Sequence, residues 1–129
     1  GLFSNASDIG TFCKMLLDGG YYLGTRYFDT KLIDSFTRRK NIPESSDRAL
    51  GWDTPSQKGS TAGDYFSSDS YGHLGFTGTS VWSDPVNDII IVLLTNRVYP
   101  TRDKKNIQKK MYLFRRDFHN AAMKQILGV

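Results

Sequence analysis

The chain has 129 residues, of which 39% are hydrophobic and 23% are charged, a balance typical of one soluble globular domain. We therefore expect a single domain over residues 1–129 and exclude a collagen-like, coiled-coil or wholly disordered chain. The longest uninterrupted apolar run covers residues 89–94, far short of the roughly 20 residues that a membrane-spanning helix needs. No membrane span is expected.

The net charge of +4 is mildly basic, and a nucleic-acid partner usually needs a more concentrated basic patch, so no such partner is expected. Cys13 is the single cysteine, which excludes an intrachain disulfide. Its apolar neighbours at helical spacing favour a small buried side chain. With one cysteine, two histidines and no clustered carboxylates, the sequence predicts neither a metal site nor a cofactor.

Two helices are predicted near the start of the chain. Apolar residues recur at helical spacing from Ile9 to Leu17, with Ser4 or Ser7 as the N-cap and Gly19-Gly20 as the stop signal. A shorter helix is predicted over Asp29–Arg38, with Asp29 as its N-cap. Its inward side chains are predicted to be Leu32, Ile33 and Phe36.

The centre of the chain is irregular and is followed by a predicted β-hairpin. Residues 40–70 are rich in Ser, Gly, Asp, Thr and Pro, and only Ala49–Trp52 has strand character. The hairpin joins strands at Thr79–Ser83 and Ile89–Thr95 through turn residues 84–88. Because the second strand is apolar at every position from 89 to 94, it is predicted to be buried on both faces in the middle of a sheet.

A long helix is predicted over Asp103–Leu127, and its apolar stripe should lie on the sheet. The fold class is therefore α+β, an antiparallel sheet flanked by helices. Three strands at most are visible, which is few for a sheet between helices, so further strands are expected from elsewhere. The predicted stripe consists of Ile107, Met111, Phe114, Phe118, Ala122 and Ile126.

Common catalytic motifs are absent from the sequence: there is no Gly-x-Ser-x-Gly, Walker loop, His-Glu-x-x-His or Cys-x-x-Cys. The histidines are His73 and His119, and His119 is interpreted as a residue on the flank of the last helix. A basic stretch near this helix is interpreted as a solvated face, with nucleic-acid binding as a minor alternative. The stretch consists of Arg102, Lys104, Lys105, Lys109, Lys110, Arg115 and Arg116.

The segment Tyr71–Ser80 holds three glycines within seven residues. Such a segment either leaves a strand edge bare for a ligand, which His73 could then touch, or is a glycine-rich turn with His73 on the surface. Composition alone slightly favours the turn.

Several segments, in order along almost the whole chain, resemble the serine beta-lactamase-related family of class C beta-lactamases, D-alanyl-D-alanine carboxypeptidases and esterases. Within them, His73-Leu74-Gly75 resembles the family's third motif, Lys-Thr-Gly or His-x-Gly, on the strand that borders the active site. The resemblance implies a partial beta-lactamase/transpeptidase-like fold. The segments are Gly1–Ser4, Leu16–Gly20, Leu50–Trp52, Tyr71–Ser80, Asp84–Pro85 and Leu93–Arg97.

The same resemblance implies a mechanism in which a serine attacks a carbonyl and forms an acyl-enzyme that water hydrolyses. It implies that His73 helps to hold the substrate and stabilise charge, and that the backbone N–H of Phe76 is one oxyanion-hole donor. It further implies that Gly75 leaves room for substrate along the strand, and that Thr77 and Gly78 line the same edge.

The chain departs from the family pattern because it has neither Ser-x-x-Lys nor Tyr-x-Asn. The nearest matches, at Ser35–Arg38 and Ser45–Arg48, end in arginine, which cannot lose its proton to act as a base. Both motifs precede the third motif in the family. We therefore expect this chain to be the C-terminal part of a serine hydrolase, lacking its N-terminal portion and inactive alone. Leu74 within the motif, and His73 in place of lysine, favour an esterase or peptidase over a beta-lactamase.

The expected partners are a small-molecule or peptide-like substrate in the parent protein and the N-terminal portion of the same domain. An open strand edge could also pair with a second copy of the chain. By family analogy, the compartment is the periplasm or cell envelope. The rival hypothesis is a non-catalytic binding domain that uses the glycine-rich strand edge or the basic C-terminal helix.

Overall fold

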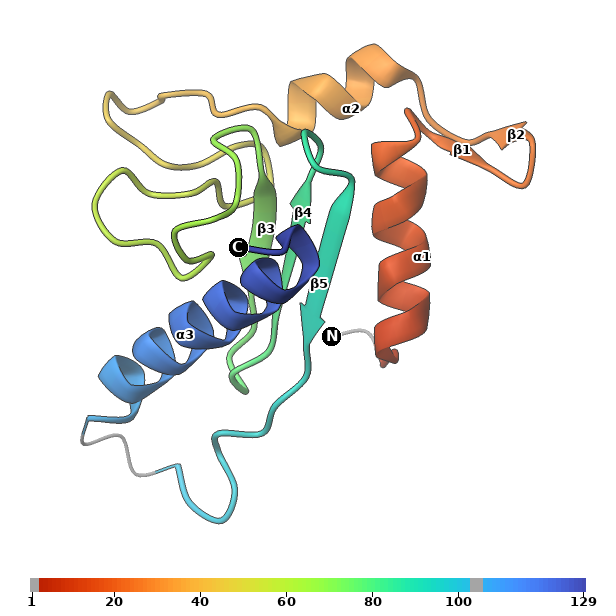
Figure 1. Ribbon diagram of the computed structural model, residues 1–129. Coiled ribbons are helices and arrows are strands. Elements are labelled where there is room, and N and C mark those ends of the chain that lie inside the picture. The colour runs from red at the N-terminus through yellow and green to blue at the C-terminus, as the bar shows by residue number, and fades with distance from the viewer. Residues whose placement is uncertain (1–2, 103–105) are drawn as a thin grey trace.

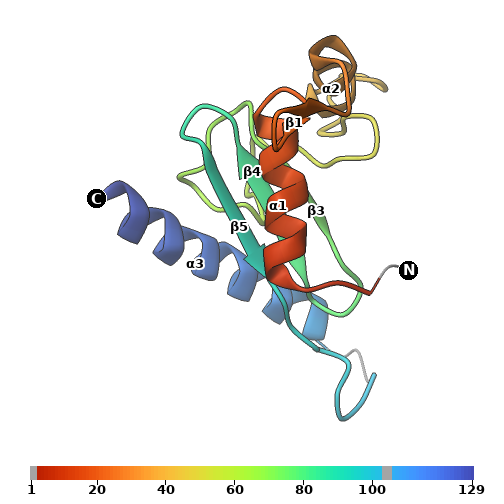
Figure 2. The ribbon, with the colours of Figure 1, turned by 90° about the vertical axis from the view of Figure 1, so that its right-hand side faces the viewer.

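The computed structural model describes residues 3–102 and 106–129 and shows an antiparallel sheet between two helices (Figures 1 and 2). The sheet has the strand order β3-β4-β5, and each strand is antiparallel to its neighbour. This arrangement confirms the predicted α+β class. The strands are β3 (Tyr71–Leu74), β4 (Ser80–Asp84) and β5 (Ile89–Leu93).

The hairpin β4–β5 forms where the sequence predicts it, and the carboxylate of Asp84 holds its turn. This buried carboxylate accepts hydrogen bonds from the backbone N–H groups of Val86 and Asn87, and from the Asn87 side chain. It also accepts from the backbone N–H and the hydroxyl of Ser67, at 2.9 and 2.7 Å. Burial opposes ionisation, but these donors outweigh it and lower the pKa of Asp84.

Strand β5 lies at the end of the sheet in the described chain, so its predicted place in the middle of the sheet is wrong here. Its side chains alternate between buried and half-buried. The continuous apolar run has a different cause, because α1 (Ala6–Leu17) covers one face of the sheet and α3 (Ile107–Leu127) covers the other (Figure 2). Both faces of β5 therefore meet apolar side chains.

Helix α1 starts at a cap that the sequence analysis missed. Asn5, and not Ser4 or Ser7, accepts from the backbone N–H of Asp8 at 3.0 Å. The predicted stop is confirmed, since Gly19 and Gly20 follow the helix with φ of 69° and 93°. Cys13 is 1% exposed, and burial raises the pKa of its thiol.

A small hairpin and a second helix follow α1. The hairpin of β1 (Tyr21–Tyr22) and β2 (Thr25–Arg26) was not predicted. Helix α2 (Thr30–Thr37) begins at the predicted cap, where the Asp29 carboxylate accepts from the Lys31 N–H at 2.8 Å. Of its three predicted inward side chains Ile33 is buried, whereas Leu32 and Phe36 are 48% and 46% exposed.

Helix α3 is rotated relative to the prediction. Its buried side chains are Arg115, His119 and Met123, whereas Phe114 and Ile126 of the predicted stripe are about half exposed. The predicted start at residues 103–105 lies outside the described residues. This rotation lets Arg115 and His119 donate hydrogen bonds to carbonyl oxygens of the facing turn and loop.

Two apolar cores, one on each face, hold the sheet between its helices. On the α1 face Tyr71 packs with Met15, Leu16 and Ile33, and its ring lies edge-on to Trp52 at 5.2 Å. On the α3 face the core is built from Ala62, Phe66, Trp82, Ile89, Ile91 and Met123.

Two glycine substitutions should change stability in opposite directions. A Cβ at Gly72 would lie 2.3 Å from the Val81 carbonyl oxygen and 2.5 Å from Trp82, so we expect Gly72→Ala to lower the free energy of unfolding by about 1–3 kcal/mol. A Cβ at Gly10 in α1 meets nothing within 4 Å, so Gly10→Ala should raise it by roughly 0.8–1 kcal/mol. Urea denaturation measures both. Equal effects of the two variants would contradict the close packing at Gly72.

Candidate active-site edge

The outer edge of β3 carries the third-motif residues, and a loop covers its first half. Asp53 donates its N–H to the Gly72 carbonyl at 2.7 Å and accepts from the Gly72 N–H at 2.9 Å. Because backbone groups along a strand alternate in direction, those of Leu74 face the same outer side as those of Gly72. In the described part of the chain, Gly72 is the one residue of this edge that pairs with another segment.

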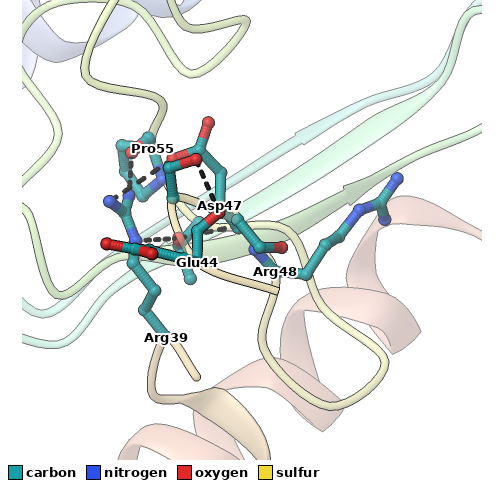
Figure 3. Close-up of polar contacts among 8 residues, drawn as sticks. Arg39, Glu44, Asp47, Arg48 and Pro55 are labelled. Carbon is teal, nitrogen blue, oxygen red and sulfur yellow. Dashed lines mark hydrogen bonds and ion pairs between the residues drawn. The ribbon is translucent and has the colours of Figure 1, made fainter. Parts of the chain in front are cut away.

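The side chain of Arg39 holds this covering loop in place (Figure 3). Its Nε donates to the Thr54 hydroxyl at 2.9 Å, and its Nη2 donates to the Pro55 carbonyl. Its Nη1 lies 3.3 Å from the Asp47 carboxylate, and the Thr54 hydroxyl donates to the Asp47 carbonyl. These contacts fix Thr54 and Pro55, and so place Asp53 beside Gly72.

A pocket of about 440 Å³ lies beside this edge, between the loop, the sheet and α3. Its walls include Leu74 from β3, Tyr112 from α3 and the ion pair of Arg48 with Asp53. Among the described residues, no three His, Cys, Asp or Glu side chains gather as metal ligands would.

His73 is exposed near the end of β3. Its Nδ1 lies 2.9 Å from the Leu74 carbonyl oxygen. Since a carbonyl oxygen can only accept, Nδ1 carries a hydrogen and donates it. Phe76 and Thr77 are also exposed, whereas Gly78 is buried.

The turn from β3 to β4 requires both of its glycines. A Cβ at Gly75 would lie 1.9 Å from the Thr79 hydroxyl oxygen. Gly78 has a φ of +100°, and a Cβ there would lie 2.4 Å from the Thr95 hydroxyl oxygen and 2.9 Å from Met111. The shape of the turn therefore explains both glycines without reference to a ligand.

Arg115 reaches from α3 to the inner side of this turn. Its Nη2 donates to the carbonyl oxygens of Gly75 and Thr79 at 2.8 and 2.9 Å, and its Nε donates to that of Gly78 at 3.1 Å. Arg115 is 8% exposed, so its interpretation as part of a solvated basic face is wrong. Arg116 of the same stretch pairs with Asp64, which further reduces the charge that this helix offers to a nucleic acid.

His119 lies one helical turn beyond Arg115 and is fully buried. Its Nδ1 donates to the Thr61 carbonyl at 2.6 Å, and its Nε2 accepts from the Ser80 hydroxyl at 3.3 Å. Burial lowers the pKa of His119, the Thr61 carbonyl opposes this, and the charge of Arg115 adds to the lowering. The neutral ring thus joins α3 to both the sheet and the long loop.

Comparison with known proteins settles the family. The family model described as Beta-lactamase matches residues 1–112. The chain belongs to the beta-lactamase family. Relatives from Salmonella agona, Salmonella gallinarum and Salmonella typhi, each named "Putative D-alanyl-D-alanine carboxypeptidase", are 41%, 41% and 40% identical to it over 99 residues. Those residues make up 75% of the chain and 22% of each relative.

The match confirms the predicted resemblance to serine beta-lactamase-related proteins. It also shows that the chain spans only 22% of the length of these curated relatives. In the described part of this beta-lactamase-family chain, no helix has both the length and the apolarity needed to cross a membrane.

The sequence does not predict the buried hydrogen bonds of Arg115. It also does not predict the two hydrogen bonds by which His119 joins α3 to the loop and the sheet. One signal was present, because residues 111, 115, 119 and 123 are spaced four apart and so share one face of a helix. The interpretation of the basic stretch as a solvated face left this spacing unused. Arg97, which also contacts the turn, ends the family-like segment Leu93–Arg97, and no sequence pattern indicates this contact.

The stability of this beta-lactamase-family chain should fall in mild acid because of His119. Its pKa when folded lies below the ordinary value of 6.5, so the unfolded chain takes up the proton first as the pH falls. The contribution of the neutral ring is thus complete above pH 6.5, and it is lost progressively as the pH falls from that value to the lowered pKa.

Urea denaturation of wild type and His119→Gln at a series of pH values measures this effect. The variant should be less stable at neutral pH but lose less stability in that window. Asp84, with its lowered pKa, affects stability only in stronger acid, as the pH falls through 3.8. Identical pH dependence of the two proteins would contradict the role of His119.

Proposed function

We propose that this chain supplies the third-motif strand of a serine hydrolase that works through an acyl-enzyme, and that the active serine comes from another part of the natural protein. The observation that carries the proposal is the placement of His73-Leu74-Gly75 on an outer strand edge, with His73 exposed and the following turn held by buried donors. Such an edge offers a bound acyl group backbone donors in fixed positions.

Each residue of the edge has a proposed role. When the serine hydroxyl bonds to the substrate carbonyl carbon, the carbonyl π electrons move to its oxygen, and the Phe76 N–H donates to that oxyanion. His73 contacts the substrate and stabilises the developing charge. Gly75 has no side chain and so leaves room for the substrate along the strand, and Thr77 and Gly78 line the same edge. The oxyanion electrons then re-form the carbonyl, the bond from its carbon to the leaving group breaks, and the leaving group takes the proton that the serine loses. Water then hydrolyses the acyl-enzyme.

The proposed substrate is a small-molecule or peptide-like ester or amide. The names of the relatives refer to a D-alanyl-D-alanine carboxypeptidase, which favours a peptide-like substrate and a periplasmic or cell-envelope location. The motif carries Leu74 where the family often has a hydroxyl, so a peptidase or esterase is favoured over a beta-lactamase.

Acylation of the natural protein that contains this chain tests the proposal. A fluorophosphonate probe should add its mass to that protein and not to the 129-residue chain run beside it. His73→Ala in the longer protein should slow labelling about 10-fold or more, since one positioned catalytic contact typically contributes at least that much. Lys31→Ala, a change on α2, serves as the control and should label at the wild-type rate. Labelling of the short chain would show that its nucleophile lies within it.

We also propose that the edge of β5, which pairs with no further strand in the described part of the chain, pairs with one from the N-terminal portion of the same domain or from a second copy. Exposed strand edges tend to find a partner. The isolated chain should therefore elute as a dimer or larger species in concentrated size-exclusion runs, and addition of the N-terminal portion should shift it to a one-to-one complex. A clean monomer that ignores the added portion would contradict this pairing.

A further inference from the structure

We propose that Arg115 is a positioning residue that aims the backbone N–H of Phe76 toward the outer edge of β3. This inference rests on the function proposed above for that N–H group. The observation behind it is a cation, buried behind the turn, whose hydrogen bonds go to the backbone of the residues that would form the oxyanion site.

The contacts of Arg115 are unusual for a buried charge. In the part of the chain that the structure describes, no carboxylate lies within ion-pair distance of its guanidinium. Three carbonyl oxygens, from Gly75, Gly78 and Thr79, take the place of a counter-ion. A buried charge is costly unless its donors are satisfied, so these three carbonyls are held firmly toward the helix.

The geometry of the peptide bond converts this hold into an orientation. The Gly75 carbonyl and the Phe76 N–H belong to the same peptide unit, which is planar and trans, so they point in opposite directions. Since the Gly75 carbonyl points inward to Arg115, and also accepts from the Gly78 N–H at 3.0 Å, the Phe76 N–H is aimed outward. The Gly75 N–H also points inward, since it donates to the Thr79 carbonyl. The backbone groups of successive residues point to opposite sides of a strand, so those of Phe76 are expected to point outward.

The positive charge also acts through the peptide unit. A cation beside a carbonyl oxygen draws electron density toward that oxygen and leaves the N–H of the same unit a better donor. Chains of hydrogen bonds strengthen one another in this way by about 10–30% per bond. Arg115 therefore both aims the Phe76 N–H and polarises it, without touching the substrate.

Arg97 holds the next peptide unit from the other side. Its Nε donates to the Phe76 carbonyl at 2.6 Å, its guanidinium carbon lies 4.8 Å from the centre of the Phe76 ring, and its N–H donates to the Thr77 carbonyl. Phe76 thus has both of its flanking peptide units fixed by arginines. Arg115 lies beyond residues 1–112, so the family match does not include it.

The test uses the natural protein that contains this chain, with Arg115→Gln, Arg115→Lys and the matched control Arg116→Gln. Arg116 is the adjacent arginine of the same helix, and its pairing with Asp64 is on the surface. Steady-state hydrolysis of a p-nitrophenyl ester and inhibition by a phenylboronic acid, which forms a tetrahedral adduct with an active serine, give the readouts.

Loss of a whole oxyanion donor costs about 10²–10³ in kcat, so we expect Arg115→Gln to lower kcat roughly 10-fold to 10²-fold and weaken boronic acid binding in parallel, with KM changed less than about 2-fold. Arg115→Lys should give an intermediate loss, since an ammonium lacks the planar fork of donors. Arg116→Gln should match the wild type. An Arg115→Gln enzyme that retains the kcat and boronic acid affinity of Arg116→Gln would overturn the inference.

A direct readout separates this inference from the proposed function. The amide signals of Phe76 in ¹⁵N NMR spectra should shift in Arg115→Lys and not in Arg116→Gln, whether or not the protein hydrolyses an ester. If the wild type fails to react with any serine probe while this shift is seen, the proposed function fails and the positioning stands. If Arg115→Gln does not fold, Arg115→Lys carries the test, and an unchanged Phe76 amide together with unchanged kcat rejects it.

Discussion

The seam between α3 and the sheet depends on a buried cation that has no carboxylate partner among the described residues. Arg115 replaces the water it loses with three backbone carbonyls from one tight turn. These hydrogen bonds hold Arg115 against the turn, and they are made with α3 rotated so that Arg115 faces the sheet. That rotation then brings His119 and Met123 inward and leaves Phe114 about half exposed. A polar contact therefore acts together with apolar packing in setting how the last helix lies.

Side chains from outside the long irregular loop over residues 40–70 bind it at several places along its length. Arg39 holds Thr54 and Pro55, His119 holds Thr61, and Asp84 holds Ser67. Each anchor is a buried or half-buried side chain that binds loop backbone or a short polar side chain. Since backbone groups within a protein need partners, these anchors let a segment without regular structure pack against both ends of the sheet.

Local sequence signals predicted the local structure well. The glycines after α1, the Asp29 cap and the turn at residues 84–88 each act through their own backbone, so the sequence shows them directly. Features that depend on distant partners were not predictable in the same way. Arg115 is a surface residue by composition, and it is buried only because Gly75, Gly78 and Thr79 meet it some 36–40 positions earlier in the chain. The third motif could be found through family resemblance, but the hydrogen bonds from Arg115 that hold the turn after it could not.

The bridge between Asp53 and Gly72 also sets a limit on what can lie along β3. An extended chain that adds to this edge advances about 3.3 Å per residue and must stop where Asp53 already occupies the backbone groups of Gly72. Only the stretch from Leu74 toward the turn remains for such pairing. The loop therefore limits how far an extended chain could pair along this edge, and the contacts of Arg39 hold the loop in that position.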